Sequence, residues 1–377
     1  MANVQRIIAL FVMLAALVDG RAMIAADRGA NEFAVGADLS SMAQAERNGP
    51  VFKDNGEAKP GLALFKDHGY NWIRLRLFHT PSRLPNNLDY TIALAKAAKE
   101  RGYKFLLDFH YSDTWADPQK QFIPQAWSKL LHEELVEAVY AYSRDSVSAF
   151  REAGAMPDMV QVGNEITGGM LWPDGKLPGN WSNFADLVKA GIRGVHAGAG
   201  DGTQPRIMIH IDRGGDKNRT KWFFDKCKEH EIDFGVIGQS YYPWWHGSLT
   251  DLEENLAFMA NEYDKDIMLV EVAYNWRPAE YRNKSGPFPE TPAGQKEFLE
   301  SVKRIVESTP GGHGKGIFWW EPAVGRGGVA SRGMFDDEKN ALPVTSVFDS
   351  AGAIHRDAAA AAAPAGDNVK ADAGAQN

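Results

Sequence analysis

Between residues 32 and 350 of this 377-residue chain, short apolar runs alternate with longer segments in which apolar residues recur every three or four positions. Short runs rich in β-branched and aromatic residues predict buried strands, and the longer pattern predicts amphipathic helices. The clearest helical segments are 88–102, 128–154 and 293–308. The eight predicted strands are Phe33–Asp38, Trp72–Leu77, Lys104–His110, Met159–Asn164, Arg206–Ile211, Phe234–Tyr241, Ile267–Glu271 and Gly316–Trp320.

This alternation predicts parallel strands joined by right-handed crossovers, which places the chain in the α/β class. Length alone allows two or three domains, but eight strand–helix units fit one closed (β/α)8 TIM barrel better. No G-x-G-x-x-G motif follows the first strand, and no G-x-x-x-x-G-K-[ST] motif occurs, so nucleotide-binding α/β folds lose support. We therefore assign residues 32–352 to a single barrel.

The two ends of the chain depart from this pattern. An apolar run at 7–18 follows Arg6 and precedes small residues, so that cleavage after Ala22 or near Ala26 fits a secretory signal peptide at 1–26. The apolar run is too short for the roughly 20 residues of a membrane span. Residues 358–377 are rich in alanine and of low complexity, which predicts a disordered tail. We predict an exported protein without membrane association after signal cleavage.

The charge balance argues against polyanionic partners. The chain has 41 Lys and Arg against 49 Asp and Glu, a net charge of −8, and no basic run, so we expect no binding to nucleic acid. A single cysteine, Cys227, excludes a disulfide within the chain, and we expect it to be a core thiol. We expect the protein to act as a monomer.

A TIM barrel carries its chemistry at the carboxyl ends of its strands. Charged residues there are not ordinary surface residues, because barrel strands are buried on both faces. Arg74 and Arg76 share one face of the second strand, where they can hold buried carboxylates for structural reasons or lower the pKa of a nucleophilic one. The polar and aromatic residues at the strand ends are Asp38, Arg74, Arg76, Asp108, His110, Asn164, Glu165, His210, Asp212, Tyr241, Tyr242, Glu271, Trp320 and Glu321.

Metal-dependent and serine hydrolysis find little support among these residues. Histidines and aspartates are present, but the first strand is not followed by H-x-H, and neither H-E-x-x-H nor G-x-S-x-G occurs. Two glutamates meet a sharper requirement, since Glu165 closes the fourth strand and Glu271 the seventh. Both should point into the barrel mouth, and glycoside hydrolysis needs such a pair of carboxyl groups.

Six segments carry a resemblance to a known family. They are DFHYSDTWADP (108–118), GNEITGGMLWP (163–173), IMIHIDRGGD (207–216), QSYYPWW (239–245), LVEVAYNW (269–276) and FWWEPA (318–323). In this order, from about Gly36 to Phe348, they resemble the arabinogalactan endo-β-1,4-galactanases of glycoside hydrolase family 53, which belongs to clan A. Asn-Glu after strand four and Glu after strand seven are shared by the clan, whereas SDTWADP and GNEIxxGxLWP are more specific.

The resemblance implies a retaining endo-hydrolase of β-1,4-galactan in pectin side chains, with Glu165 as acid/base and Glu271 as nucleophile. We then expect Arg76 and a tyrosine hydroxyl to hold down the pKa of Glu271, and the charge of Glu271 to raise the pKa of Glu165. Asn164 is expected to bond the sugar 2-hydroxyl, a contact that strengthens in the transition state.

Further residues are expected to bind or orient the sugar. We expect His210 and Tyr242 around Glu271 and the sugar, and Asp113 as a hydrogen-bond acceptor. Trp115 and Trp320 are expected to stack on the apolar face of galactose. Several indoles beyond the strand ends predict an open groove and internal cleavage, although some of them, such as Trp172, can equally pack the loops. These indoles are Trp115, Trp172, Trp244, Trp245 and Trp320.

The loop after strand eight holds a calcium ion in some bacterial members of that family. Here Asp336, Asp337 and Glu338 are adjacent rather than alternating, so we favour a solvated turn over a calcium site. We expect no required cofactor and no metal at the catalytic centre.

Two other functions stay open at this point. One is another clan A hydrolase of the mannanase or xylanase type. The other is a non-catalytic glycan-binding barrel, which would keep the indoles but would not need both glutamates.

Overall fold

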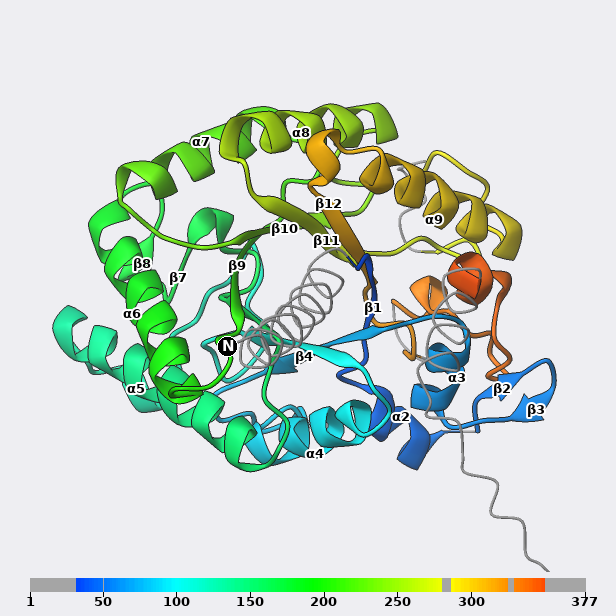
Figure 1. The fold of residues 1–377 in the computed structure, drawn as a ribbon, viewed down its shortest axis with the longest axis horizontal. Coiled ribbons are helices and arrows are strands. Elements are labelled where there is room, and N and C mark those ends of the chain that lie inside the picture. Colours follow the sequence, from blue (N-terminus) through cyan, green and yellow to red (C-terminus); the bar gives the residue numbers. More distant parts are fainter. Residues whose placement is uncertain (1–31, 50, 280–285, 325–328, 350–377) are drawn as a thin grey trace, which may run out of the picture.

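The computed structural model describes residues 32–49, 51–279, 286–324 and 329–349 (Figure 1). Eight parallel strands close into a barrel in the order β1-β12-β11-β10-β9-β6-β5-β4, which confirms the predicted (β/α)8 architecture. The predicted signal peptide and tail, and the last three residues assigned to the barrel, lie outside the described residues. The barrel strands are β1 (Ala34–Asp38), β4 (Trp72–Leu77), β5 (Lys104–Phe109), β6 (Met159–Val162), β9 (Arg206–Ile211), β10 (Val236–Tyr241), β11 (Asp266–Val272) and β12 (Gly314–Trp319).

Helices surround the barrel (Figure 1). Several begin at side-chain caps, such as Asn87 before α4 (Leu88–Lys99) and Ser248 in a capping box with Asp251 before α8 (Leu249–Tyr263). Two short hairpins, β2–β3 (Lys53–Asp54, Glu57–Ala58) and β7–β8 (Gly169–Met170, Gly175–Lys176), lie in the loops. The helices are α2 (Met42–Asn48), α3 (Gly61–Asp67), α4 (Leu88–Lys99), α5 (His132–Glu152), α6 (Trp181–Ala199), α7 (Lys217–Glu229), α8 (Leu249–Tyr263) and α9 (Pro292–Glu307).

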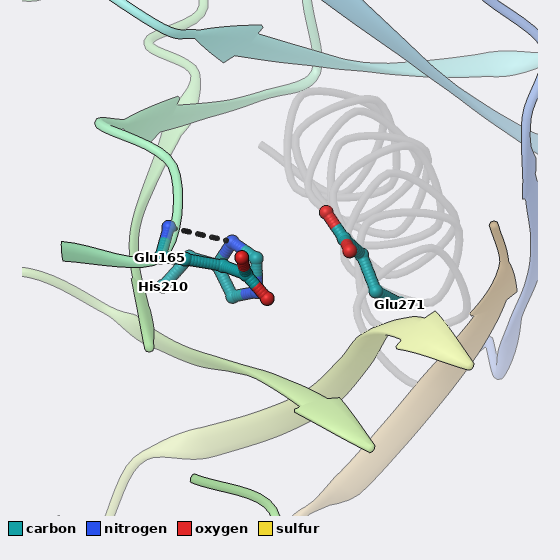
Figure 2. Close-up of side chains that lie close together, drawn as sticks. All are labelled: Glu165, His210 and Glu271. Carbon is teal, nitrogen blue, oxygen red and sulfur yellow. Dashed lines mark hydrogen bonds between the residues drawn. The ribbon is translucent and has the colours of Figure 1, made fainter. Parts of the chain in front are cut away.

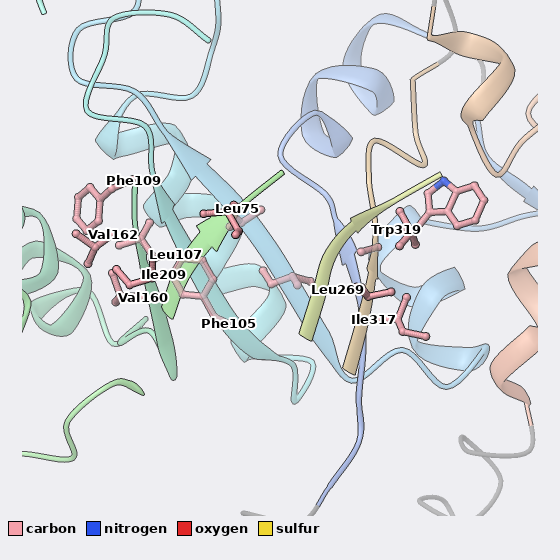
Figure 3. Close-up of a cluster of buried hydrophobic side chains, with 14 of the residues drawn as sticks. Leu75, Phe105, Leu107, Phe109, Val160, Val162, Ile209, Leu269, Ile317 and Trp319 are labelled. Carbon is pink, nitrogen blue, oxygen red and sulfur yellow. The ribbon is translucent and has the colours of Figure 1, made fainter. Parts of the chain in front are cut away.

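The strands bury side chains on both faces. Outward residues such as Leu75, Val160, Leu269 and Ile317 belong to one large apolar cluster between the barrel and its helices (Figure 3). A second apolar cluster fills the barrel interior near the amino ends of the strands. We call it the lower interior, and it consists of Ala34, Trp72, Leu106, Met159, Met208, Val236, Met268, Val270 and Phe318.

Close packing in the lower interior depends on glycine at one neighbouring strand position. Gly36 lies opposite Phe318, and a Cβ atom there would come within 2.2 Å of the phenyl ring. A side chain at position 36 would therefore displace Phe318.

Towards the carboxyl ends the inward positions become polar. We call this layer the upper interior, and it consists of Asp38, Arg74, Arg76, Asp108, Gln161, His210, Ser240 and Glu271, all of them buried. Inward and outward positions alternate along each strand with a period of two. The same strands therefore carry both the apolar lower interior and the polar upper interior.

None of the helices in the described parts of the chain is long and apolar enough to cross a membrane.

Candidate active site

Glu165 is presented by a tight turn at the end of β6. The strand ends at Val162, Gly163 has φ +89°, and Glu165 itself has φ +48°. A left-handed conformation is uncommon for a residue with a side chain and is typical of functional sites. The turn leaves the side chain almost buried, with 8% of the residue exposed.

Glu271 faces the barrel interior because of a β-bulge. Gln239 of β10 lies opposite Leu269, but the next residue, Ser240, lies opposite Glu271. Strict alternation from the inward Met268 would turn Glu271 outward, and the extra residue of the bulge restores its inward direction. The bulge therefore delivers the second carboxylate to the barrel mouth.

The two carboxylates meet there (Figure 2). An oxygen of Glu165, an oxygen of Glu271 and a ring nitrogen of His210 all lie within 4.8 Å of one another. The sequence-based expectation that Glu165 and Glu271 share the mouth agrees with this arrangement.

The cation beside Glu271 is Arg74, and the expectation of Arg76 in that place is wrong. The Arg74 guanidinium lies 3.0 Å from Glu271, 2.9 Å from Asp38 and 2.9 Å from Asp108. Arg76 lies two residues further along β4, so it pairs with Asp38 and Glu321 instead. Sequence periodicity put both arginines on the inward face but could not separate their partners.

The pKa of Glu271 also differs from the expectation. Burial raises it to about 7, although the Arg74 cation and the hydrogen bond donated by the Tyr242 hydroxyl (2.9 Å) act in the opposite direction. Desolvation thus exceeds the stabilisation by a single shared guanidinium. Asp108, which also faces Arg74, keeps a pKa of about 2 despite its burial.

Glu165 has no cation beside it among the described residues. Burial and then the charges of Glu271 and Asp212 raise its pKa well above the usual range, and a hydrogen bond from Ser240 opposes this shift. Because Glu271 has a guanidinium and Glu165 does not, Glu165 is the member of the pair that holds a proton more strongly.

His210 lies near both carboxylates, and its direct contacts are with the backbone of Glu165 and with Ser240. Its Nδ1 is 3.3 Å from the backbone nitrogen of Glu165 (Figure 2). Its Nε2 is 2.9 Å from the Ser240 hydroxyl. The ring is fully buried, so it underlies the site and does not face the open mouth. Burial and the Arg74 charge hold the pKa of His210 well below its usual range, which keeps the ring neutral.

Asn164 is held firmly by protein groups. Its Oδ1 accepts a hydrogen bond from Arg74 (2.7 Å), and its Nδ2 donates one to the carbonyl of Ala116 (2.9 Å). A side-chain amide nitrogen carries two hydrogens, and Ala116 is the one acceptor of Asn164 Nδ2 among the described residues.

Aromatic rings form part of the mouth around these groups. Tyr242 bonds Glu271, and its ring is 6.3 Å from the ring of Trp320, which is in turn 6.3 Å from Trp115. Arg76 lies 4.4 Å from the centre of the Trp115 ring, so this arginine supports an indole at the mouth.

Other predicted contacts are placed differently. Both carboxylate oxygens of Asp113 accept hydrogen bonds from backbone N–H groups, those of Thr80 (2.9 Å) and Gln125 (2.8 Å). These bonds hold two loops together, a role that the sequence does not suggest. Trp244 is buried in a stack on Tyr274 and is not a rim residue, whereas its neighbour Trp245 is 43% exposed.

A third carboxylate, Glu321, is among the strand-end residues of the sequence but not among the predicted sugar-binding or catalytic residues. It follows Trp320 with φ +52°, pairs with Arg76, and accepts a hydrogen bond from Ser41 (3.0 Å). Burial raises its pKa against the effect of Arg76. The signal available in the sequence is its position one residue after the predicted strand Gly316–Trp320.

Three further residues of the upper interior contact the site but are not among the predicted catalytic or sugar-binding residues. They are Arg74, Gln161 and Ser240, which contact Glu271, Asp108 and Glu165 respectively. Arg74 had the same signal as Arg76, while Gln161 and Ser240 are inward strand positions whose neutral side chains do not stand out in a sequence.

One group of possible metal ligands occurs in the described part of the chain, namely Glu165, His210 and Glu271. The Arg74 cation lies 3.0 Å from Glu271, and both ring nitrogens of His210 already face protein groups. This environment suits proton transfer and nucleophilic attack better than it suits a second cation.

The acidic residues after β12 take part in a turn. Asp336 accepts backbone N–H groups of Glu338 (3.0 Å) and Asn340 (2.8 Å), and Asp337 pairs with Arg277. These contacts describe the turn, and the expectation that it holds no calcium stays a prediction.

Known proteins match this chain over most of its length. The family model described as Glycosyl hydrolase family 53 matches residues 34–354. An arabinogalactan endo-β-1,4-galactanase of Thermothelomyces thermophilus is 36% identical over 333 residues, 83% of this chain and 98% of that protein. Another from Cellvibrio japonicus is 35% identical over 346 residues, 84% of this chain and 90% of that protein.

Two solved structures are similar over most of their length. The GH53 catalytic domain of Ignisphaera aggregans has 32% identity and a TM-score of 0.79, covering 84% of this chain and 95% of that one. A structure reported in a study of two fungal β-1,4-galactanases has 35% identity and a TM-score of 0.79, covering 84% of this chain and 98% of that one.

Proposed function

Because the chain belongs to glycosyl hydrolase family 53, we propose that it is an exported endo-β-1,4-galactanase that cleaves the galactan side chains of pectin with retention of configuration. The observation that carries this proposal is the carboxylate pair, Glu165 and Glu271, with oxygens within 4.8 Å of one another at the barrel mouth. Relatives named arabinogalactan endo-β-1,4-galactanase, from Thermothelomyces thermophilus and Cellvibrio japonicus, support the choice of substrate.

The separation of the two carboxylates supports the retaining course. Retaining glycosidases place their carboxyl groups about 5–5.5 Å apart, whereas inverting enzymes need about 6.5–9.5 Å to leave room for water. The two carboxylates of this protein are too close to leave room for a water molecule between the sugar and the carboxylate that would activate that water.

In the first step Glu271 attacks the anomeric carbon, and its carboxylate forms a covalent bond to the sugar as the glycosidic C–O bond breaks. Glu165 gives its proton to the departing oxygen. In the second step water gives a proton to Glu165 and attacks the anomeric carbon, which releases Glu271 as a carboxylate. We expect the second N–H of Asn164, whose first N–H is bonded to Ala116, to bond the sugar during both steps.

These roles require Glu271 charged and Glu165 protonated at the start. Activity should therefore rise with pH as Glu271 loses its proton near its raised pKa of about 7. It should fall at higher pH, where Glu165 loses its own proton.

The surroundings of the pair support a polysaccharide substrate. Trp115 and Trp320 lie with their ring centres 6.3 Å apart, and we expect their indoles to stack on the sugar. A cavity of about 420 Å³ is lined by Asp212, Arg213 and Trp245, among others. A neutral glycan that extends past the catalytic pair on both sides would be cleaved internally, and export agrees with the apolar run at the amino terminus.

A panel of polysaccharides tests the substrate. We expect release of reducing ends from β-1,4-galactan, with oligosaccharides of several lengths early in the reaction, and little release from β-mannan or xylan. Preference for mannan or xylan would replace galactanase by another clan A activity. Binding of galactan without hydrolysis by the wild-type protein would indicate a glycan-binding barrel instead.

A further inference from the structure

Ser240 lies between the proposed acid/base and a buried histidine. Its hydroxyl donates a hydrogen bond of 2.7 Å to Oε1 of Glu165 and is 2.9 Å from Nε2 of His210. Ser240 and His210 are both fully buried, so substrate does not touch either side chain. Their position relative to Glu165 nevertheless determines which oxygen of that carboxyl group can hold a proton.

The protonation of the histidine ring follows from its neighbours. A backbone N–H has no alternative protonation state, and the N–H of Glu165 points at Nδ1 of His210 at 3.3 Å. Nδ1 must therefore present its lone pair, and the amide nitrogen of Gln161 at 3.0 Å agrees with this. The Oδ1 of Asn164, 3.1 Å from Nδ1, already accepts a hydrogen bond from Arg74. A neutral ring with a lone pair on Nδ1 carries its hydrogen on Nε2.

A directed chain of hydrogen bonds results. Nε2–H of His210 donates to Oγ of Ser240, and the hydroxyl hydrogen of Ser240 is then directed to Oε1 of Glu165. Oε1 is thus an acceptor. The other oxygen, Oε2, has no hydrogen-bond partner among the described residues and is not fully buried.

We propose that Ser240 and His210 are positioning residues which hold Oε1 of Glu165 as an acceptor and so reserve Oε2 for the proton exchanged with the sugar. This inference rests on the acid/base role given to Glu165 above. In the first step the proton leaves Oε2 for the glycosidic oxygen, and in the second step water returns a proton to Oε2. Neither Ser240 nor His210 gains or loses a proton over the cycle.

The same contact stabilises the charged form of Glu165, because a hydroxyl donor binds a carboxylate more strongly than a carboxylic acid. Loss of the donor should therefore raise the pKa of Glu165. The other titratable or charged groups that act on Glu165 come from several elements, and they are Glu271, Tyr242, Asp212, Asp117 and His210.

The substitution Ser240→Ala tests the chain of hydrogen bonds. We expect the alkaline limb of the kcat/KM profile on galactan to move upward by about half a pH unit or more, with kcat lowered roughly tenfold. The loss should be smaller for a dinitrophenyl β-galactobioside, whose leaving group needs no proton in the first step. An alkaline limb that stays in place would overturn the proposal.

Histidine variants provide the conservative comparison. His210→Gln keeps an N–H within reach of Ser240 and should leave the alkaline limb near its wild-type position. His210→Leu removes that donor and should move the limb in the same direction as Ser240→Ala, which also tests the idea if the serine variant does not fold. A shift in the Gln variant equal to that in the Leu variant would contradict the proposal.

A remote serine serves as the matched control. Ser143 on α5 is also buried and hydrogen-bonded, to Val139 and Tyr111, and Ser143→Ala should leave the pH profile unchanged. Wild-type protein that does not hydrolyse galactan would refute the proposed function itself. Active wild-type protein with an unmoved profile in Ser240→Ala would refute only the positioning role.

Discussion

The lower and upper interior of the barrel are built on the same eight strands but do different work. The lower interior is a cluster of apolar side chains in which Phe318, Met208 and Trp72 are buried. The upper interior buries two guanidinium groups and three carboxylates in the same closed space, with Glu165 and Glu321 at its rim. Apolar burial is favourable by itself, whereas buried charges need partners to offset desolvation.

The partners in the upper interior are unevenly distributed. Arg74 forms ion pairs with Asp38, Asp108 and Glu271. Arg76 forms ion pairs with Asp38 and Glu321. Glu165 accepts a hydrogen bond from a hydroxyl group and has no cation beside it among the described residues. This imbalance leaves one carboxyl group protonated beside one that ionises more easily, which is the arrangement that acid/base and nucleophilic catalysis require.

The largest expected effect is loss of activity when either catalytic carboxyl group is replaced. Glu271→Gln removes the nucleophile and should lower kcat on galactan by about 10⁴-fold or more, and Glu165→Gln should lower it by about 10²–10⁴-fold. Reducing-end assays on purified variants measure both. Glu300→Gln on the surface of α9 is the control, and wild-type turnover in either catalytic variant would reject the assigned roles.

Removal of the shared cation should reduce stability most. Arg74→Met leaves three carboxylates without their common guanidinium, which should lower the free energy of unfolding by about 3–5 kcal/mol. Urea unfolding measures this change. Arg206→Ala breaks an exposed pair with Asp266 (2.6 Å) at the other end of the barrel and should cost at most about 1 kcal/mol. Equal losses in the two variants would mean that the upper interior is not a special environment.

Truncation in the lower interior should affect stability without altering the chemistry. Phe318→Ala leaves a cavity in this cluster and should lower the free energy of unfolding by about 3–4 kcal/mol. The pH profile of kcat/KM for the folded fraction should keep the wild-type shape. A displaced profile would show that the lower interior and the catalytic layer are coupled.

The smallest expected effect is a gain in stability when the proposed acid/base, Glu165, is replaced. The pKa of Glu165 is raised in the folded state, so the folded protein binds the proton more tightly than the unfolded chain and loses stability as pH rises between the two values. Glu165→Gln removes this loss. It should raise Tm by roughly 2–4 °C at pH 8 and by less at pH 5, as calorimetry can measure. A lower Tm at pH 8 would show that the charge of Glu165 is stabilised after all.

The sequence predicted the barrel well because its strands are buried on both faces and stand out as apolar runs between helical segments. All eight predicted strands correspond to barrel strands, with ends that differ by up to two residues, as for Phe234 and Gly316. The presence of Glu165 and Glu271 at the mouth followed from strand ends alone.

The contacts of these residues could not be predicted in the same way. The bulge at Ser240 that turns Glu271 inward leaves no mark in the sequence. The choice of Arg74 rather than Arg76 as its partner depends on height within the barrel, and two residues on one strand face look equivalent in a sequence. The raised pKa of Glu271 depends on how completely the mouth excludes water, which is a property of the folded packing.

Trapping of the covalent intermediate tests the central claim most directly. The reagent is a 2-deoxy-2-fluoro β-1,4-galactobioside with a dinitrophenyl leaving group, which slows release of the glycosyl-enzyme. Mass spectrometry of the digested wild-type protein should show one fluorinated galactobiosyl unit on the peptide that contains Glu271. Glu165→Gln should still acquire the label, since this leaving group needs no acid. Labelling of a different residue, or turnover of galactan with inverted configuration and no label, would contradict the account.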